Sequence, residues 1–315
     1  MNFNQLQYFT ELVLQGSFTK AANRLGISQP ALSQQINKLE QELNYKLIDR
    51  LKKPLVLTPE GEVLLERIEE VTKLMDSLKD IAIELEETIK GELKVGIIPT
   101  LAPYFVPMFI NDINQRYPGL KLIVEEVVTE DILSNLKLGE LDAGIISTPV
   151  KVSGIQFTPL FYERFFLYIS DRHPLFSHEE INLNEFDLHD LWYLKEGNCF
   201  QNQVNELCSL AKTPVEGQNL IYYSNSIESL RRIVEIRKGM TFIPELATAG
   251  VAPEYEDMVK PIAGNQPLRE ISLAVSRVHS KKKLLDRFVE VVLDNLPERM
   301  KTKPESGIVS TNLSF

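Results

Sequence analysis

The fold of this 315-residue chain is decided by residues 18–40, FTKAANRLGISQPALSQQINKLE. This stretch predicts two helices, over residues 18–25 and 29–40, joined by a short turn that contains glycine. Ser28 is a favourable N-cap for the second helix, and Pro30 suits its first turn. A helix, a glycine turn and a polar helix in this order are the pattern of a helix-turn-helix.

The second of these helices has one apolar and one polar face. Leu32, Ile36 and Leu39 recur at helical spacing and predict the packed face. The opposite face predicts contact with a DNA major groove, because glutamine hydrogen-bonds base edges and lysine neutralises phosphate. The residues expected to contact DNA there are Gln29, Pro30, Ser33, Gln34 and Lys38. An ordinary helical hairpin with a solvated polar face is the alternative.

A short basic hairpin, or wing, is predicted next, around the run Pro54-Leu55-Val56-Leu57. Arg50, Lys52 and Lys53 would reach DNA phosphates from it. The net charge of −10 taken alone argues against a nucleic-acid partner. Residues 1–58, however, carry seven lysines and arginines against four acidic residues, a local net charge of +3. Basic charge is therefore concentrated where the motif needs it.

A long amphipathic helix is predicted from Thr58-Pro59 to about residue 89, with threonine as N-cap and proline at the first helical position. Its apolar stripe cannot be buried by one helix alone, which predicts pairing with a second copy of the chain. The stripe consists of Val63, Leu64, Ile68, Val71, Leu74, Met75, Leu78, Ile81, Ala82 and Leu85.

Composition excludes several classes of protein. The N-terminus lacks the basic start and apolar run of a signal peptide, and no stretch of 18 apolar residues predicts a membrane helix. With only two cysteines, structural disulfides are not expected and a reducing cytoplasm is predicted. The four histidines show no metal-ligand spacing, and no nucleophile–base motif stands out. We therefore expect neither a metal, nor a cofactor, nor an enzyme.

Strands and helices alternate after residue 90, which predicts an α/β domain with a mostly parallel sheet. Strands are expected at 93–98, 120–127 and 141–146, and again at 165–169, 219–223, 240–243 and 269–276. Helices are expected up to residue 116 and at 130–138, 226–237 and 282–296. Thr100 and Thr129 follow the first two strands, so their hydroxyls are expected either to line a ligand cleft or to cap helices.

Both cysteines lie in one further predicted helix, which runs from Cys199 to Ala211 with Asn198 as N-cap. Cys199 would occupy the first turn, where the helix dipole and free backbone N–H groups favour a thiolate. Nine residues of helix separate two Cα atoms by about 13.5 Å, whereas a disulfide needs Cα atoms within about 7 Å. A bond between Cys199 and Cys208 would therefore require this helix to unwind. The alternative is that both thiols are inert.

The chain resembles the LysR-type transcriptional regulators. The resemblance rests on the runs 16–22 (GSFTKAA), 28–33 (SQPALS) and 57–61 (LTPEG) at their spacings. It implies a winged helix-turn-helix over 1–58, a linker and dimerisation helix over 59–90, and a periplasmic-binding-protein-like sensor domain over 91–300. That domain would consist of two α/β subdomains, I (92–162 and 268–300) and II (163–267). Residues 301–315 are polar and aperiodic, which predicts a flexible tail.

Within this family, the sensor half is similar to the members that sense hydrogen peroxide. That similarity rests on Gly197-Asn198-Cys199, the spacing to Cys208, the two threonines and Arg269. It implies that Cys199 is the peroxidatic thiol and Cys208 the resolving thiol. It also implies that the peroxide is bound by Thr100, Thr129, Asn198, Asn202 and Arg269. Such sensors commonly carry histidine and aspartate where this chain has Asn198 and Asn202, which can hydrogen-bond a peroxide but cannot carry a proton.

The resemblance also implies the partners. These are double-stranded promoter DNA of oxidative-stress genes, hydrogen peroxide, further copies of the chain in a homodimer or homotetramer, RNA polymerase and a thiol reductant. One alternative is a LysR-type regulator that responds to a small organic effector with inert cysteines. A thiol peroxidase is a third hypothesis, and it is disfavoured because turnover needs nothing from a DNA-binding domain.

Overall fold

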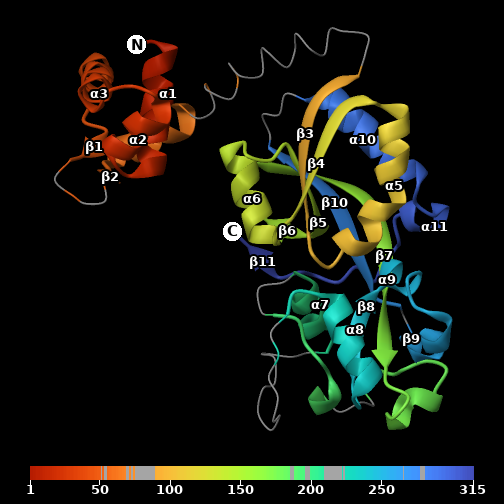
Figure 1. Cartoon of the computed structure of the whole chain (residues 1–315). Helices are drawn as coiled ribbons and strands as arrows, with labels where there is room; N and C mark the ends of the chain where they lie inside the picture. Colours follow the sequence, from red (N-terminus) through yellow and green to blue (C-terminus); the bar gives the residue numbers. More distant parts are fainter. Residues whose placement is uncertain are drawn as a thin grey trace. The chain divides into compact units, whose positions relative to one another are not determined.

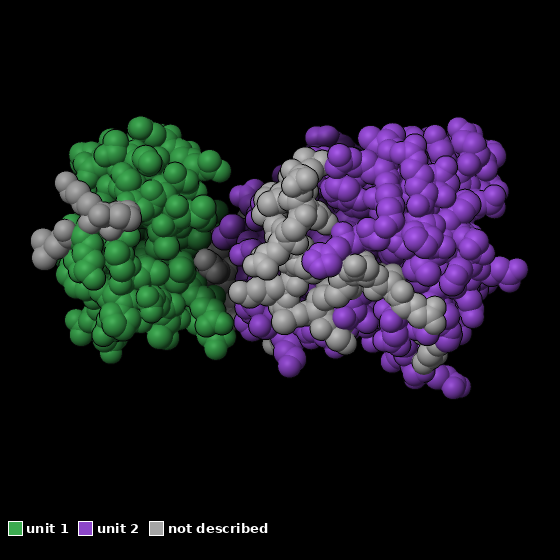
Figure 2. Space-filling view, turned by 90° about the horizontal axis from the view of Figure 1, so that it is seen from below, with its two compact units in different colours: residues 1–85, 278–280 green, residues 86–277, 281–315 purple. Residues whose placement is uncertain are grey.

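The computed structural model describes residues 1–50, 52, 55–68, 71, 74, 89–184, 188–195, 199–208, 222, 224–264, 266–276 and 281–315. The chain divides into two compact units (Figure 2). Residues 1–85 with 278–280 form the N-terminal unit, and residues 86–277 with 281–315 form the regulatory unit. No helix among the described residues is long and apolar enough to cross a membrane.

The N-terminal unit begins with three helices, α1 (Phe3–Gln15), α2 (Phe18–Leu25) and α3 (Gln29–Leu43). Ser28 caps α3 as predicted, because its hydroxyl accepts a hydrogen bond from the backbone N–H of Ala31 at 3.3 Å. The helix continues three residues beyond its predicted end and stops at Asn44, which takes a left-handed conformation. The apolar faces of all three helices share one core that includes Phe9, Leu12, Leu32, Ile36 and Leu39.

The wing is present as a short antiparallel pair, β1 (Ile48–Asp49) with β2 (Val56–Leu57). Thr58 then starts the linker helix as predicted, since its hydroxyl accepts a hydrogen bond from the N–H of Gly61 at 3.0 Å. Residues 59–68 are helical. Most of the predicted linker helix beyond residue 68 lies outside the described residues, and so does Lys53.

The regulatory unit contains one seven-stranded sheet in the order β4-β3-β5-β10-β7-β8, with β9 paired to β7 (Figure 1). Its strands are β3 (Lys90–Ile97), β4 (Gly119–Glu126), β5 (Ala143–Thr148), β7 (Ile155–Ile169), β8 (Met240–Pro244), β9 (Val259–Pro261) and β10 (Leu268–Ser276). Strands β6 (Val150–Lys151) and β11 (Leu313–Ser314) form a separate two-stranded sheet. The helices are α5 (Ala102–Arg116), α6 (Thr129–Leu138), α7 (Cys199–Leu207), α8 (Ile227–Ile236), α9 (Glu245–Thr248), α10 (Lys282–Asp294) and α11 (Glu298–Lys301). Short 3₁₀ turns cover Pro174–Ser177, Leu188–Asp190 and Pro253–Met258.

The sheet is less parallel than the sequence predicted. Strand β3 pairs in parallel with β4 and β5, but β10 runs antiparallel to β5 and β7. Strand β7 is also antiparallel to β8 and β9. The difference arises because β7 and β10 carry the chain from one end of the unit to the other and back, instead of belonging to a repeated strand–helix–strand unit.

Two apolar cores flank these long strands. The first core includes Leu93, Phe105, Phe109 and Phe288, and the second core includes Phe165, Tyr168, Leu230 and Phe242. Strand β7 passes through both, because its residues 155–164 pair with β10 and its residues 165–169 pair with β8. The sequence indicated only the second part of β7, since residues 155–160 lack a long apolar run.

The C-terminal tail differs from the flexible segment that was predicted. In Figure 1 it runs from α11 across the middle of the regulatory unit to β11, which pairs in parallel with β6. Ile308 also forms a β-bridge with Leu268, and Thr311 and Val309 are buried. Isolated apolar residues and backbone groups hold the tail in place, and too few of them recur at a fixed period to be recognised in the sequence.

Candidate redox site and DNA-binding face

Helix α7 begins at Cys199, and its first turn contacts both cores of the regulatory unit. Cys199 is 2% exposed and belongs to the first core, whereas Phe200 is 1% exposed and belongs to the second. The ring of Phe200 stacks on Phe165, with 5.2 Å between centroids. The start of the helix is therefore held between the two halves of the unit.

Arg269 lies beside this turn, and its side chain is fully buried. Its guanidinium carbon is 5.0 Å from the ring centroid of Phe200, the residue that follows Cys199. The guanidinium donates to the hydroxyl of Thr100 at 3.1 Å and to the backbone carbonyl of Thr100 at 3.2 Å. Two of the sequence-predicted residues, Thr100 and Arg269, are thus in direct contact next to the first turn of α7.

The counter-ion of Arg269 is Glu163, which the sequence analysis missed. Its carboxylate accepts from Nε of Arg269 at 2.8 Å and lies 2.7 Å from Nη2, and both side chains are 0% exposed. The second carboxylate oxygen accepts from the backbone N–H of Leu246 at 3.1 Å. Burial raises the pKa of Glu163, and the adjacent guanidinium opposes that shift. The sequence feature that could have drawn attention to Glu163 is its place, as a single glutamate, inside the apolar run LFYERFFLYI, residues 160–169.

Thr129 is buried like Thr100 but is not bound to the Arg269 cluster. It is the first residue of α6, and the N-cap residue is Val128. The alternative prediction, that Thr129 caps this helix, is therefore wrong. Its hydroxyl is buried and has no hydrogen-bond partner within the described part of the chain. Such a group costs free energy unless something fills its hydrogen bond, which fits a site for a small polar ligand.

Cys208 directly follows the last residue of α7, and its backbone N–H still donates to the carbonyl of Val204 at 3.0 Å. Both cysteines are free thiols. Cys208 is half-buried in contact with the second core, and burial raises its pKa to about 12. The intact helix agrees with the prediction that these thiols cannot meet before α7 unwinds. Asn202 is half-buried on α7, and Asn198 lies outside the described residues.

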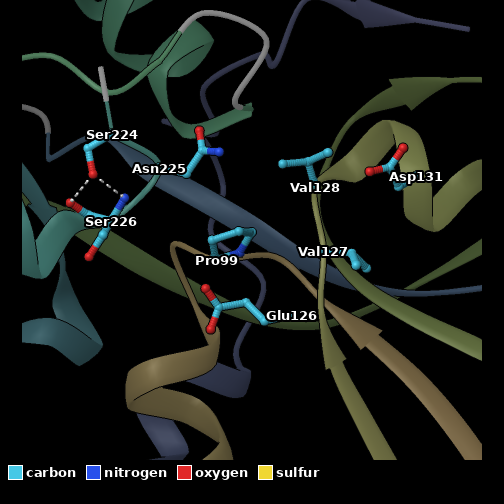
Figure 3. Close-up of a pocket in the computed structure, with 8 residues that line it drawn as sticks. All are labelled: Pro99, Glu126, Val127, Val128, Asp131, Ser224, Asn225 and Ser226. Carbon is cyan, nitrogen blue, oxygen red and sulfur yellow. Dashed lines mark hydrogen bonds between the residues drawn. The ribbon is translucent and has the colours of Figure 1, made fainter. Parts of the chain in front are cut away.

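A cleft pocket lies beside both threonines and has a volume of about 390 Å³ (Figure 3). Pro99, which precedes Thr100, and Val128, which precedes Thr129, contribute to its wall. The remaining lining residues are Glu126, Val127 and Asp131 from the first half of the unit and Ser224, Asn225 and Ser226 from the second. In Figure 3 the serines lie across the pocket from Val128 and Asp131. No group of three or more potential metal ligands occurs where side chains are described.

The DNA-binding residues predicted on α3 lie on its accessible side. Gln29, Pro30, Gln34 and Lys38 are exposed and Ser33 is half-buried, and Lys52 in the wing is exposed. None of these six packs into the core of the N-terminal unit.

Arg50 has a different environment from the other predicted DNA contacts. Its guanidinium donates to Asn37 at 2.7 Å and to Glu40 at 3.1 Å, and it lies 5.3 Å from the ring centroid of Phe18. Glu40 is buried and also accepts from the backbone N–H of Leu47 at 2.9 Å. These bonds fasten the wing to α3, so Arg50 has a structural role that the sequence did not indicate.

Both parts of the chain match known families. Residues 3–62 match the bacterial regulatory helix-turn-helix protein, lysR family, and residues 86–297 match the LysR substrate binding domain. The chain belongs to the LysR family. LysR-family proteins are transcription regulators rather than enzymes, which agrees with the expectation from the sequence.

Similar LysR-family proteins include regulators named for hydrogen peroxide. The chain is 29% identical to the hydrogen peroxide-inducible genes activator of Haemophilus influenzae over 94% of this chain and 97% of the relative. It is 31% identical to the DNA-binding transcriptional dual regulator OxyR of Escherichia coli over 87% of this chain and 88% of the relative. Full-length OxyR C199D from Pseudomonas aeruginosa has a similar structure, with a TM-score of 0.72, 29% identity and coverage of 97% and 98% of the two chains.

Proposed function

We propose that this LysR-family regulator senses hydrogen peroxide through oxidation of Cys199 and a disulfide with Cys208, and thereby controls oxidative-stress genes. The observation that carries the proposal is the arrangement of α7. One free thiol opens the helix beside the buried Arg269, and the other follows its last residue. The printed name of the Haemophilus influenzae relative, hydrogen peroxide-inducible genes activator, supports the same reading.

The proposed chemistry has two steps. The Cys199 thiolate attacks one oxygen of hydrogen peroxide, the O–O bond breaks, and the products are a sulfenic acid and hydroxide, which takes up a proton to become water. Cys208 then attacks the sulfenic sulfur, a disulfide forms, and a second water leaves. A cellular dithiol reverses the switch by thiol–disulfide exchange: it reduces the Cys199–Cys208 bond to two thiols and is itself oxidised to a disulfide.

In this proposal, five residues assist the first step. Thr100, Thr129, Asn198 and Asn202 hydrogen-bond the two peroxide oxygens. The hydroxyl of Thr129 has no partner among the described residues, which supports this assignment. Arg269, whose charge is balanced by the buried Glu163, holds Thr100 next to the first turn of α7.

The burial of Cys199 adds a filter to this mechanism. A thiol that is 2% exposed reacts only when local motion opens a path to it, and a small neutral oxidant needs the smallest path. We therefore expect hydrogen peroxide to oxidise the folded protein much faster than tert-butyl hydroperoxide does. Comparable rates in the folded protein, measured by thiol loss, would contradict this filter.

On the DNA side, the proposal requires at least a dimer. Two copies of α3 would present Gln29, Ser33, Gln34 and Lys38 to two half-sites about one helical turn apart, or multiples of it. The linker helices would pair, and two dimers would form a tetramer. Oxidation would remodel α7, change how regulatory units pack, and so change the spacing of the DNA-binding units and contact with RNA polymerase. The protein would act in the cytoplasm, where its promoter DNA lies.

The deciding experiment titrates the reduced protein with hydrogen peroxide and maps the products by mass spectrometry. We expect a Cys199–Cys208 disulfide at low peroxide and an altered DNA complex. The Cys199→Ser variant should lose the response while its reduced-state DNA affinity stays unchanged. A Cys199→Ser variant that still responds to peroxide would overturn the role of this thiol.

The cleft pocket favours a second candidate function, a response to a small organic effector. Its walls come from both halves of the regulatory unit, so a ligand there would change how the halves meet. Under this alternative, a double variant with Cys199→Ser and Cys208→Ser would keep its full transcriptional response. Under the peroxide proposal, the double variant does not respond.

A further inference from the structure

Helix α7 is fastened to the rest of the regulatory unit by the side chain of Gln203, which is fully buried. The hydroxyl of Ser147, on β5, donates to Oε1 of Gln203 at 3.1 Å. Nε2 of Gln203 donates to the backbone carbonyl of Val309 in the C-terminal tail at 2.9 Å. One amide thus joins three segments that are far apart in the sequence.

A second bond ties the same helix to the same tail. Nδ2 of Asn312 donates to the carboxylate of Glu206 at 2.8 Å. The tail itself is anchored on both sides of these contacts. Before them, the N–H of Val309 donates to the carbonyl of Leu268 at 2.9 Å, and after them Leu313 pairs with Val150.

The position of Gln203 gives these bonds a consequence beyond packing. It lies four residues after Cys199 and five residues before Cys208, within the stretch that must lose its helical form before the thiols can meet. Loss of this turn breaks the bonds to Ser147 and Val309. The Ser147 hydroxyl then keeps only its longer bond to the carbonyl of Glu270 at 3.4 Å, and the carbonyl of Val309 loses the side-chain donor that it has in the reduced form. Disulfide formation therefore requires the bonds between α7 and the C-terminal tail to break.

We propose that Gln203 and the C-terminal tail form a latch that sets the redox threshold of the switch. The proposal rests on the proposed function, because it concerns the equilibrium between the dithiol and the Cys199–Cys208 disulfide. The latch stabilises only the reduced form with α7 intact. By linkage, it raises the reduction potential of the couple, so the reduced protein resists oxidation until more oxidant is present.

Two variants of the full-length protein test the latch. Gln203→Met keeps the length of the side chain and removes both hydrogen bonds. Deletion of residues 311–315 removes Asn312 and the pairing of β11 with β6. Each protein is equilibrated with mixtures of reduced and oxidised dithiothreitol, and its disulfide is quantified. We expect the equilibrium to shift toward the disulfide by about tenfold or more, equivalent to about 30 mV for a two-electron couple.

The control variant is Lys303→Ala, which changes an exposed residue of the same tail and should leave the potential unchanged. A second measurement separates the latch from general stability. A residue with a merely structural role lowers the urea stability of the reduced and oxidised forms equally, whereas the latch variants should destabilise the reduced form and spare the oxidised form. Equal losses in both forms overturn the latch.

Hydrogen exchange tests the latch without any disulfide. In the reduced protein, the amides of α7 should exchange faster in both latch variants than in the wild type. Unchanged exchange overturns the latch. A wild-type protein that forms no Cys199–Cys208 disulfide overturns the threshold together with the proposed function. If the wild type and both variants form the Cys199–Cys208 disulfide with the same reduction potential, the latch is overturned and the proposed function stands.

Discussion

At the scale of single residues, Arg269 and Glu163 form an ion pair in which both side chains are fully buried. Both are removed from water, and the pair is completed by Thr100 and by the backbone of Leu246. A buried ion pair of this kind adds little net stability compared with apolar residues, but it is costly to break from one side only. It therefore holds Thr100 and the first turn of α7 in one fixed geometry.

A first prediction concerns this pair. The Glu163→Gln variant leaves the guanidinium of Arg269 buried without a counter-charge, so we expect the free energy of unfolding to fall by about 3–5 kcal/mol. Urea unfolding of the regulatory unit measures it. The control is Glu92→Gln, which removes the exposed partner of Lys121 and should change little. Similar effects of the two substitutions would contradict the prediction.

A second prediction follows from the raised pKa of Cys208. Because burial raises this pKa to about 12, the thiolate fraction should still grow about tenfold per pH unit between pH 7 and 9.5. In a Cys199→Ser variant, the rate of alkylation by iodoacetamide should rise accordingly without levelling off. The same variant unfolded in urea is the control, and its rate should level off near pH 9. A plateau near pH 9 in the folded protein would refute the burial argument.

The sequence indicated some of these residues and not others, for a physical reason. Thr100 was found because it follows a predicted strand, Arg269 because the family resemblance marks it, and Cys199 because it is predicted to lie at a helix start. Glu163 and Gln203 were missed as site residues. Their importance depends on Arg269 and Val309, which are 106 residues away from each of them along the chain. No local pattern specifies such a partner.

At the scale of elements, the helix-turn-helix was the most predictable part of the chain. Its caps, its glycine turn and its helical periodicity are all local, so Ser28 and Thr58 start helices as expected. The crossing path of β7 and the packed tail were not predictable in this way. Both depend on pairing with strands that are distant in the sequence, and the tail has no periodicity of its own.

A third prediction separates two basic residues of the N-terminal unit. Lys38 is exposed on α3, so Lys38→Ala should weaken binding to all DNA sequences and reduce the slope of log affinity against log salt by about 1. Fluorescence anisotropy at several salt concentrations measures both effects. Thermal stability should stay unchanged.

The matched variant is Arg50→Ala. It removes bonds to Asn37 and Glu40 and the contact with Phe18, so it should lower thermal stability as well as DNA affinity. Circular dichroism measures the melting temperature of each variant. If Arg50→Ala weakens DNA binding with no loss of stability, Arg50 acts as a phosphate contact rather than as the fastening of the wing.

At the scale of the whole molecule, the net charge of the chain hides a difference in charge between its N-terminal part and the rest. The chain carries a net charge of −10, yet residues 1–58 are positive by three charges. Only local counting reveals the DNA-binding unit. The acidic balance of the remaining chain favours solubility and disfavours non-specific contact with DNA away from α3.

A fourth prediction concerns the assembled regulator on its promoter. If oxidation changes the spacing of the DNA-binding units, the DNase footprint of the oxidised protein should differ in its half-site spacing from that of the reduced protein. The Cys199→Ser variant should give the reduced footprint under both conditions. Identical footprints for oxidised and reduced wild-type protein would refute a mechanism that acts through spacing.

The continuous strand β7 has one further mechanical consequence. Fifteen residues of extended chain span about 50 Å, and this rod is embedded in both halves of the regulatory unit. Two halves that share one continuous strand cannot separate by hinge opening without breaking the hydrogen bonds that hold this strand in each half. Twisting about the strand keeps those bonds. If the proposed disulfide remodels α7, we therefore expect the two halves to answer by twisting about β7 rather than by gaping apart.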